Sequence, residues 1–254
     1  MVGAGNLATH LARAFYKKGF RILQVYSRTP ESAARLAQEV EADPVTDPAA
    51  LTTWGRLYIA ALTDEALPGL IPALTSGRNR ALWVHTAGSL PLDLWAGHAE
   101  RYGVFYPLQT FSRQHEVDFG RIPVFVEGSD PDTTALLRAV AATVSAKVYE
   151  ATSAQRRYLH LGAVLACNFT NHLYTLASDL LVRHGLPFDA LQPLIDETAR
   201  KVHELSPHQA QTGPAARGDR HVMDEHLRLL EEDPYLAQVY RLLSQGIEER
   251  KNKD

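Results

Sequence analysis

The sequence of 254 residues predicts two domains of different class, an α/β domain over residues 1–151 and an all-α domain over residues 152–254. A glycine-rich turn lies within the first eight residues and is followed at once by the amphipathic pattern of a helix. Apolar runs of strand length then alternate with helical patterns as far as residue 149, which is typical of a parallel sheet covered by helices. From residue 153 onward only helical patterns occur.

Gly3, Gly5 and Ala8 form a G-x-G-x-x-A motif at the start of the first predicted helix. In a dinucleotide-binding turn the first glycine allows the reversal from strand to helix, and the second admits a diphosphate. The small third residue lets the helix pack on the sheet. The amides at the helix start then favour an anion. Because a strand pattern follows at residues 20–26, we interpret the motif as a dinucleotide site rather than a turn without function.

Only Met1 and Val2 precede this turn, although a strand that feeds it needs about five residues. We therefore expect either a truncated central strand or a native chain that begins upstream of Met1, and the second is the interpretation we favour.

The end of the second predicted strand indicates which cofactor binds. An acidic residue here would bind the ribose hydroxyls of NAD, but the sequence has Ser27, Arg28 and Thr29. Hydroxyl and guanidinium donors suit a ribose 2′-phosphate, so NADP is predicted in preference to NAD. A capping turn ahead of the helix predicted at residues 31–40 is the structural alternative, and the two roles are compatible.

The remaining elements follow from periodicity and from turn residues. Further strands are predicted at residues 57–62, 81–86, 103–106, 123–127 and 147–149, with a short one near 44–46. Helices are predicted at residues 31–40, 65–74, 92–98 and 132–144, and then at 153–184, 189–205, 219–232 and 234–250. Strand ends of this kind line the ligand crevice of an open parallel sheet.

Composition narrows the classes of function. The net charge is −3 and no basic stripe occurs, which disfavours nucleic-acid binding. No apolar stretch is long enough to predict a membrane span, and no secretory signal is recognisable. The single cysteine, Cys167, excludes an intrachain disulfide and fits a reducing cytoplasm.

The helix predicted at residues 153–184 has an uncharged polar side opposite its apolar side. No charged residue lies between Arg157 and Asp179. The polar side carries His160, Cys167, Asn171 and Ser178, and the apolar side carries Leu165, Ala166, Phe169, Leu173, Leu176 and Leu180. A solvated helix face usually carries Lys or Glu. The polar side is therefore expected to face a cleft or another subunit, or else to be a core face whose polar groups are satisfied internally.

Several short motifs together resemble one protein family. They are the opening turn, Ser27-Arg28-Thr29, His85-Thr86-Ala87-Gly88-Ser89, Tyr106-Pro107-Leu108-Gln109-Thr110-Phe111, Asn168-Phe169-Thr170-Asn171 and the loop from Thr212 to Asp219. Over its whole length the chain resembles the Rossmann-like NADP oxidoreductases whose helical half was long labelled a domain of unknown function, and it is most similar to members from Bacteroides-type bacteria. That family is similar to 6-phosphogluconate dehydrogenase, pyrroline-5-carboxylate reductase and deazaflavin-dependent NADP oxidoreductases.

The resemblance implies a Rossmann-like N-terminal domain, a C-terminal domain like that of 6-phosphogluconate dehydrogenase, and a homodimer formed through the helical domain. It also implies three groups of cofactor-binding residues. Those at the diphosphate are Gly3, Gly5, Asn6 and Leu7, those at the adenosine phosphate are Ser27, Arg28 and Thr29, and those at the nicotinamide ribose are Leu62, Thr63, His85 and Thr86.

One departure from the superfamily concerns the acid/base residue. The β-hydroxyacid dehydrogenases of that superfamily carry a lysine four residues before an asparagine on the long helix. In this chain the residue four positions before Asn168 is Val164, and the one four positions before Asn171 is Cys167. Hydroxyacid oxidation is therefore not carried over to this chain.

An imidazole is the alternative proton relay, because it titrates near neutral pH. His160 and His85 are the two choices, and the candidate catalytic residues are His160, Asn168 and Asn171.

The loop from Thr212 to Asp219 and Gln109 are the candidate substrate contacts. Arg217 is suited to binding an anionic substrate, supported by Thr212 and Asp219. Alternatively the loop is structural, with Asp219 capping the next helix. No histidine pair has the i, i+4 spacing of a helical zinc site, so no metal is predicted.

Two functions are compatible with these residues. The first is an NADP-dependent oxidoreductase that transfers hydride between nicotinamide and a small, anionic carbonyl or imine compound. The second, favoured by the missing lysine, is an NADP(H)-binding or sensor protein without catalysis.

Overall fold

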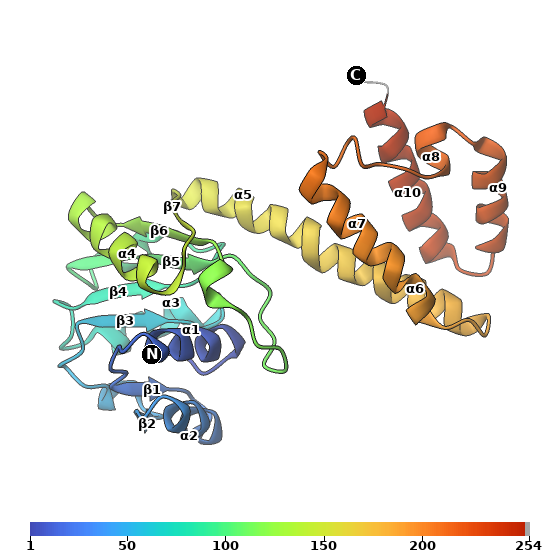
Figure 1. The fold of residues 1–254 in the computed structure, drawn as a ribbon. Coiled ribbons are helices and arrows are strands. Elements are labelled where there is room, and N and C mark those ends of the chain that lie inside the picture. Colours follow the sequence, from blue (N-terminus) through green and yellow to red (C-terminus); the bar gives the residue numbers. More distant parts are fainter. Residues whose placement is uncertain (252–254) are drawn as a thin grey trace. The chain divides into compact units, whose positions relative to one another are not determined.

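The computed structural model describes residues 1–251 and contains two compact units, Met1–Asn168 and Phe169–Asp254 (Figure 1). The first unit holds the sheet. It also includes helix α5 (Ser153–Ala163), so it extends beyond the α/β domain predicted to end at residue 151.

The sheet of the first unit is built around Val2. Its strands are β1 (Gln24–Tyr26), β2 (Asp43–Val45), β3 (Leu57–Ala60), β4 (Leu82–His85), β5 (Arg101–Pro107), β6 (Val124–Gly128) and β7 (Val148–Glu150). β1 pairs with β2, and β3 to β7 are hydrogen-bonded in sequence order. Val2 forms parallel bridges with Tyr26 and Ala60, so this single residue joins β1 to β3.

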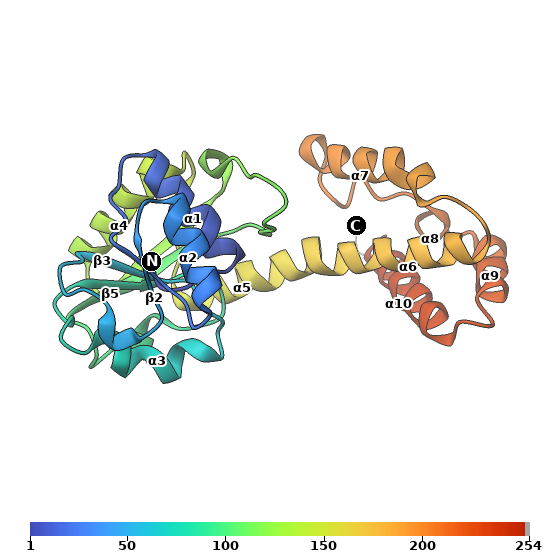
Figure 2. The ribbon, with the colours of Figure 1, turned by 90° about the horizontal axis from the view of Figure 1, so that it is seen from below.

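Helices cover both faces of this sheet, as Figure 2 shows for α1 and α3. The helices are α1 (Asn6–Lys17), α2 (Pro30–Glu39), α3 (Ala66–Thr75) and α4 (Pro131–Val144). On one face, Phe15 of α1 and Leu137 of α4 pack in a buried cluster with Phe105 of β5. On the other, Leu67 of α3 packs with Trp83. The predicted Rossmann-like α/β class is confirmed.

One strand pair runs against the parallel pattern. β6 is antiparallel to β5, with Gly103 opposite Gly128 and Pro107 opposite Val124. Antiparallel neighbours need no crossover helix. The connecting segment therefore leaves β5 and enters β6 at the same edge of the sheet, which is the edge where β3 and β4 also end.

Two predicted elements of the first unit are much shorter than expected. The strand predicted at residues 20–26 is paired in the sheet only over Gln24–Tyr26, where its register with β2 runs from Asp43 to Val45. The helix predicted at residues 92–98 is the 3-10 turn Leu92–Trp95, which precedes Gly97 with φ of +78°.

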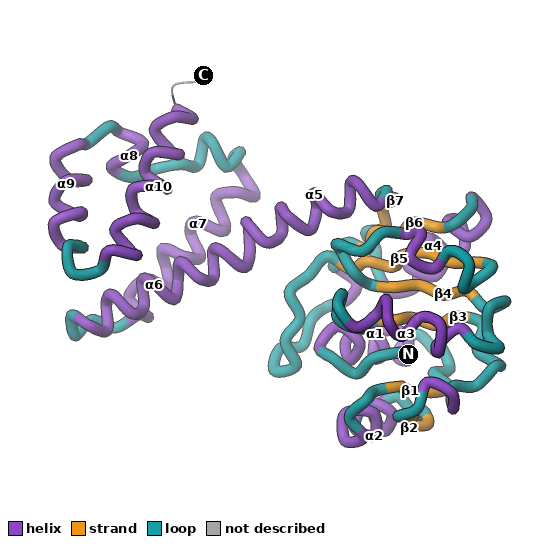
Figure 3. The backbone as a smooth tube through the Cα atoms, turned by 180° about the vertical axis from the view of Figure 1, so that it is seen from behind, coloured by secondary structure: helices purple, strands orange, loops and turns teal. Residues whose placement is uncertain are grey.

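After β7 the described chain contains helices and loops but no further strand, as expected (Figure 3). The helix predicted at residues 153–184 consists of α5, a π-helical segment (Val164–Phe169) and α6 (Thr170–Arg183). The later helices are α7 (Gln192–Glu204), α8 (Pro214–Arg217), α9 (Arg220–Leu229) and α10 (Pro234–Lys251). Because α8 lies within the loop from Thr212 to Asp219, that predicted loop is partly helical. No described helix has the length and apolarity that crossing a membrane requires.

Gly3→Ala is expected to destabilise the protein by about 2 kcal/mol or more. Gly3 has φ of +113°, and an added Cβ would overlap the carbonyl oxygen of Ala61. Gly5→Ala is the matched control, because a Cβ there meets no atom within 4 Å. Urea unfolding of the three proteins measures both effects, and equal losses in the two variants would contradict this account.

Candidate cofactor and catalytic site

The start of α1 is an open turn within the first unit, of the kind that can bind an anion. Gly5 is the N-cap residue and its helix start has no side-chain cap. Gly5 and Asn6 are exposed, whereas Ala8 is fully buried against the sheet. The amides of the first turn are thus available to a ligand, and no Cβ at Gly5 blocks the approach.

The structure brings the predicted cofactor residues of the first unit to one edge of the sheet. Val2 bridges Tyr26 and Ala60, and Ala60 pairs with His85. The residues that follow these positions therefore lie side by side. They are Gly3 after Val2, Ser27 to Thr29 after β1, Leu62 and Thr63 after β3, and Thr86 after β4.

The turn after β1 places an exposed arginine beside a serine hydroxyl that accepts a backbone hydrogen bond. The Ser27 hydroxyl accepts a hydrogen bond from the Thr29 amide at 3.2 Å. Thr29 is the N-cap of α2, but its own side chain makes no capping bond. Arg28 is exposed, and no ion pair to it occurs among residues 1–251. This set of donors fits a ribose phosphate. The structural alternative, a capping turn, is met only in part, because Ser27 binds the Thr29 amide while α2 has no side-chain cap.

His85 is completely buried, and both ring nitrogens contact backbone groups. Nδ1 accepts from the Ala87 amide at 3.2 Å, and Nε2 lies 3.2 Å from the Pro91 carbonyl, to which it donates as N–H. Burial, followed by the charge of Arg156, lowers the pKa of His85 to about 4. The imidazole is therefore neutral, and it orders the chain that leaves β4.

A buried ion pair fixes α5 to the sheet of the first unit. Arg156 is 1% exposed and binds Glu127 of β6 at 2.5 Å. Its guanidinium also donates to the carbonyls of Ala87 and Leu90. Glu127 in turn accepts from the amide and hydroxyl of Ser153 at 2.8 Å each. Such a pair stabilises the fold only because every polar group in it is satisfied.

One helical turn after Arg156, His160 lies against the ends of β4 and β5. Its Nδ1 is 3.1 Å from the Tyr106 hydroxyl. A Cβ on Gly88 would come within 2.8 Å of the imidazole, so the ring packs directly on that glycine backbone. Tyr106 is buried, which raises the pKa of its phenol. His160 itself is exposed, so the pair joins a buried hydroxyl to an exposed imidazole.

Tyr106, Arg156 and Glu127 are not among the site residues predicted from the sequence. Tyr106 belongs to a quoted motif, but nothing in the sequence indicates that it contacts a residue 54 positions later. Arg156 and Glu127 are ordinary charged residues of a helix and a strand until the fold buries them together.

The other predicted residues are exposed and lie on different elements. Gln109 follows β5, and its side-chain oxygen accepts from the Thr110 amide at 2.8 Å. Asn168 lies in the π-helical segment, a form of helix that is frequent at functional sites, and Asn171 lies in α6. Of these, only Asn171 belongs to the second unit.

In the second unit, the loop from Thr212 to Asp219 surrounds α8. Asp219 caps α9 by accepting from the Val222 amide at 3.3 Å, so the structural alternative holds for this residue. Thr212 and Arg217 are exposed, and no ion pair to Arg217 occurs among the described residues. A cation suited to an anionic ligand therefore remains in this loop.

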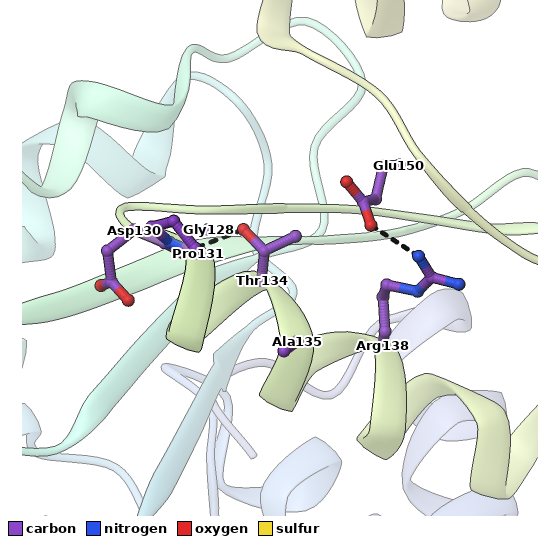
Figure 4. A pocket seen from close by; sticks show the side chains of 7 residues that line it. All are labelled: Gly128, Asp130, Pro131, Thr134, Ala135, Arg138 and Glu150. Carbon is purple, nitrogen blue, oxygen red and sulfur yellow. Dashed lines mark hydrogen bonds and ion pairs between the residues drawn. The ribbon is translucent and has the colours of Figure 1, made fainter.

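Two hollows of the first unit lie at the opposite edge of the sheet. The one in Figure 4 is lined by Gly128, Asp130, Pro131, Thr134, Ala135, Arg138 and Glu150. Arg138 and Glu150 pair with each other at 2.7 Å, and Asp130 caps α4. A larger one includes Met1, Leu57 and Leu82, where strands begin. Neither adjoins the glycine turn. Within residues 1–251 no group of His, Cys, Asp or Glu side chains is arranged to hold a metal ion.

The sequence matches two protein-family descriptions. Residues 1–86 match "NADP oxidoreductase coenzyme F420-dependent", and residues 122–247 match "Domain of unknown function (DUF2520)". A protein of Bacteroides fragilis named a putative NADP oxidoreductase has 57% sequence identity, with 98% of this chain and 96% of that one covered, and a TM-score of 0.93. This chain belongs to that NADP oxidoreductase family. The resemblance stated above is confirmed, and at the level of the family so are the oxidoreductase class and NADP.

More distant structures share the fold of this NADP oxidoreductase family. A protein of Thermotoga maritima is 22% identical, with 99% and 98% of the two chains covered and a TM-score of 0.80. A reductive aminase of Aspergillus terreus, in complex with NADPH and ethyl levulinate, is 18% identical, with 99% and 92% covered and a TM-score of 0.73. A comparison with curated proteins by sequence finds no match.

The burial of His85 predicts a pH-dependent stability. Its pKa is about 4 in the folded protein and 6.5 ordinarily, so between these values the unfolded chain binds more protons. Neutral His85 contributes about 3 kcal/mol to the free energy of unfolding above pH 6.5. This contribution is lost as the pH falls from 6.5 to 4. His85→Asn is expected to flatten this part of the curve, measured by urea unfolding from pH 7 to pH 4. An unchanged slope in the variant would contradict the assignment.

Proposed function

We propose that this chain is an NADP(H)-dependent oxidoreductase that acts on a small, anionic carbonyl or imine compound. The observation that carries the proposal is the open helix start at Gly5, which shares one sheet edge with Arg28 and with the ends of β3 and β4. A dinucleotide phosphate needs an anion site, a second phosphate site and a border for its nicotinamide half, all at one edge. Membership in the NADP oxidoreductase family supports the same conclusion.

The residues proposed to hold NADPH fall into three groups. The first-turn amides bind the diphosphate, at Gly5, Asn6 and Leu7, with Gly3 shaping the turn. The donors after β1 bind the 2′-phosphate, at Ser27, Arg28 and Thr29. The ends of β3 and β4 border the nicotinamide ribose, at Leu62, Thr63, His85 and Thr86. NADPH, when bound, supplies a hydride for the reduction.

His160 is proposed to deliver the proton of the reaction, through the hydroxyl of Tyr106. His85 is unsuited to this role, because its ring is buried and both nitrogens contact backbone groups. Burial raises the pKa of Tyr106, so its phenol keeps its proton at neutral pH. The imidazole of His160 is exposed to solvent and lies 3.1 Å from the phenol, so it is placed to pass a proton to that hydroxyl.

The anionic part of the substrate is assigned to Arg217, because this exposed guanidinium has no ion-pair partner among residues 1–251. The remaining polar candidates are proposed to bind or orient the substrate, and they are Gln109, Asn168, Asn171 and Thr212, while Asp219 keeps the capping role described above.

NADPH is expected to bind with enhancement of its nicotinamide fluorescence, and the enzyme is expected to reduce a member of a panel of ketoacids and imines. His160→Asn should leave the Kd for NADPH unchanged and lower kcat about 100-fold or more, because it removes acid/base catalysis. His184→Asn, at the end of α6, is the control and should keep full activity.

The outcomes separate the two functions. Failure to bind NADPH at millimolar concentration would refute the proposal altogether. Tight binding without turnover on the whole panel would instead favour a non-catalytic sensor. Turnover that is lost in Arg217→Ala or Asn171→Ala would reject the sensor.

The predicted homodimer is proposed to form through the helical unit. Large apolar side chains are exposed there on α6 and α7 and between them, and they include Val182, Leu186, Leu194 and Val202. Several large apolar side chains left exposed to water favour a protein interface. A second copy of the chain is the occupant we propose, because the resemblance to dimeric families implies it.

Sedimentation equilibrium is expected to give twice the mass of the chain, and Leu194→Glu is expected to give a monomer. Leu194 is 62% exposed, so its replacement by a charge should leave the fold of one chain intact while opposing burial at an interface. Leu136→Glu on α4 is the matched control, because Leu136 is an exposed leucine of the first unit. A monomeric unmodified protein would contradict the proposal.

A further inference from the structure

The segment that connects β5 to β6 is bound to the glycine turn and to α1 by three hydrogen bonds. The Asn6 side-chain amide donates to the Phe111 carbonyl at 3.0 Å. His10 Nε2 donates to the Ser112 carbonyl at 2.9 Å. Arg113 Nη2 donates to the Ala4 carbonyl at 2.8 Å. More than 100 residues of sequence separate the partners in each pair, so the fold alone brings this segment to the turn.

These contacts hold the Arg113 guanidinium beside the open helix start. Its bond to Ala4 falls on the residue between the two glycines of the motif. The side chain is exposed, and no carboxylate among residues 1–251 forms an ion pair with it. A guanidinium has five N–H donors, and the bond to Ala4 uses one of them. The positive charge of the guanidinium and its other N–H donors remain available beside the uncapped amides of the first turn of α1.

We propose that Arg113 binds the diphosphate of the dinucleotide, together with the amides of the α1 start. This inference rests on the proposed binding of NADPH and adds to it a charged residue that the glycine motif does not contain. A planar guanidinium donates two parallel hydrogen bonds to phosphate oxygens, and such charge-assisted bonds are stronger than bonds from amides alone. The neutral amides of the turn leave the two diphosphate charges unbalanced, and Arg113 offsets one of them.

The position of Arg113 distinguishes its role from that of Arg28. Arg28 follows β1, where the adenosine 2′-phosphate of NADP is expected, and NADH lacks this group. Arg113 touches the glycine turn, where the diphosphate common to NADPH and NADH is expected. Loss of Arg28 should therefore change the preference between the two dinucleotides, whereas loss of Arg113 should weaken both equally.

The test is calorimetric titration of the full chain with NADPH and with NADH. Arg113→Gln is the principal variant, because glutamine keeps an N–H donor for the Ala4 carbonyl but has no charge. We expect this variant to raise the Kd for both dinucleotides about tenfold or more and by the same factor. The Kd values of Arg113→Lys should lie between those of the unmodified protein and those of Arg113→Gln, since lysine keeps the charge but lacks the planar guanidinium.

Two further variants serve as references. Arg28→Gln should raise the Kd for NADPH about tenfold or more while that for NADH stays within about twofold. Arg121→Gln, an exposed arginine of the 3-10 turn Phe119–Arg121 in the same connection, should bind as the unmodified protein does. Thermal unfolding of every variant reports whether the loop contact matters for the fold.

Each result has a definite meaning. Unchanged affinities in Arg113→Gln, with or without a lower melting temperature, would show a purely structural arginine and overturn the inference. A loss confined to NADPH would assign Arg113 to the 2′-phosphate and would also overturn it. Unmodified protein that binds neither dinucleotide would overturn the proposed function itself, and the inference with it.

Discussion

The fold of the first unit depends on the close approach of Gly3 to the backbone after β3. The Gly3 amide donates to the Tyr26 carbonyl, and the Ala61 amide donates to the Val2 carbonyl, so the chain is held on both sides at this point. A side chain at Gly3 would overlap the Ala61 carbonyl oxygen. Because no Cβ is present, the backbone reverses directly into α1. The start of this helix consequently lies between the ends of β1 and β3, where a ligand can reach its amides.

A second constraint fixes the entry of α5. Burial of the Arg156 guanidinium is tolerated because Glu127 and two carbonyls satisfy it, and removing one partner of such a pair costs about 3–5 kcal/mol in general. The pair joins α5 to β6 and to the chain leaving β4. One turn later, His160 is thereby held on Gly88 and beside Tyr106. The same charge of Arg156 helps to keep the neighbouring His85 neutral, since it lowers the pKa of that ring.

The antiparallel direction of β6 brings a third segment, the β5–β6 connection, to the glycine turn. A parallel β6 would require a crossover across the sheet, which would carry the chain away from the glycine turn. Instead the connection stays at the edge where β5 ends, and it places backbone carbonyls and Arg113 against the start of α1. The glycine turn thus has a polar neighbour that comes from the far half of the unit. Local motif and distant loop together form the proposed anion site.

The sequence by itself determined most of the elements and the glycine turn. Alternation of apolar runs with helices specifies the α/β class, and the spacing of Gly3, Gly5 and Ala8 specifies an open helix start, because both signals are local. Tertiary structure alone decided which polar side chains meet. The Tyr106–His160 pair, the burial of Arg156 with Glu127 and the approach of the segment after β5 join residues between 29 and 109 positions apart. The hydrophobic periodicity of the sequence does not predict such contacts, because they arise from strand order and direction rather than from neighbouring residues.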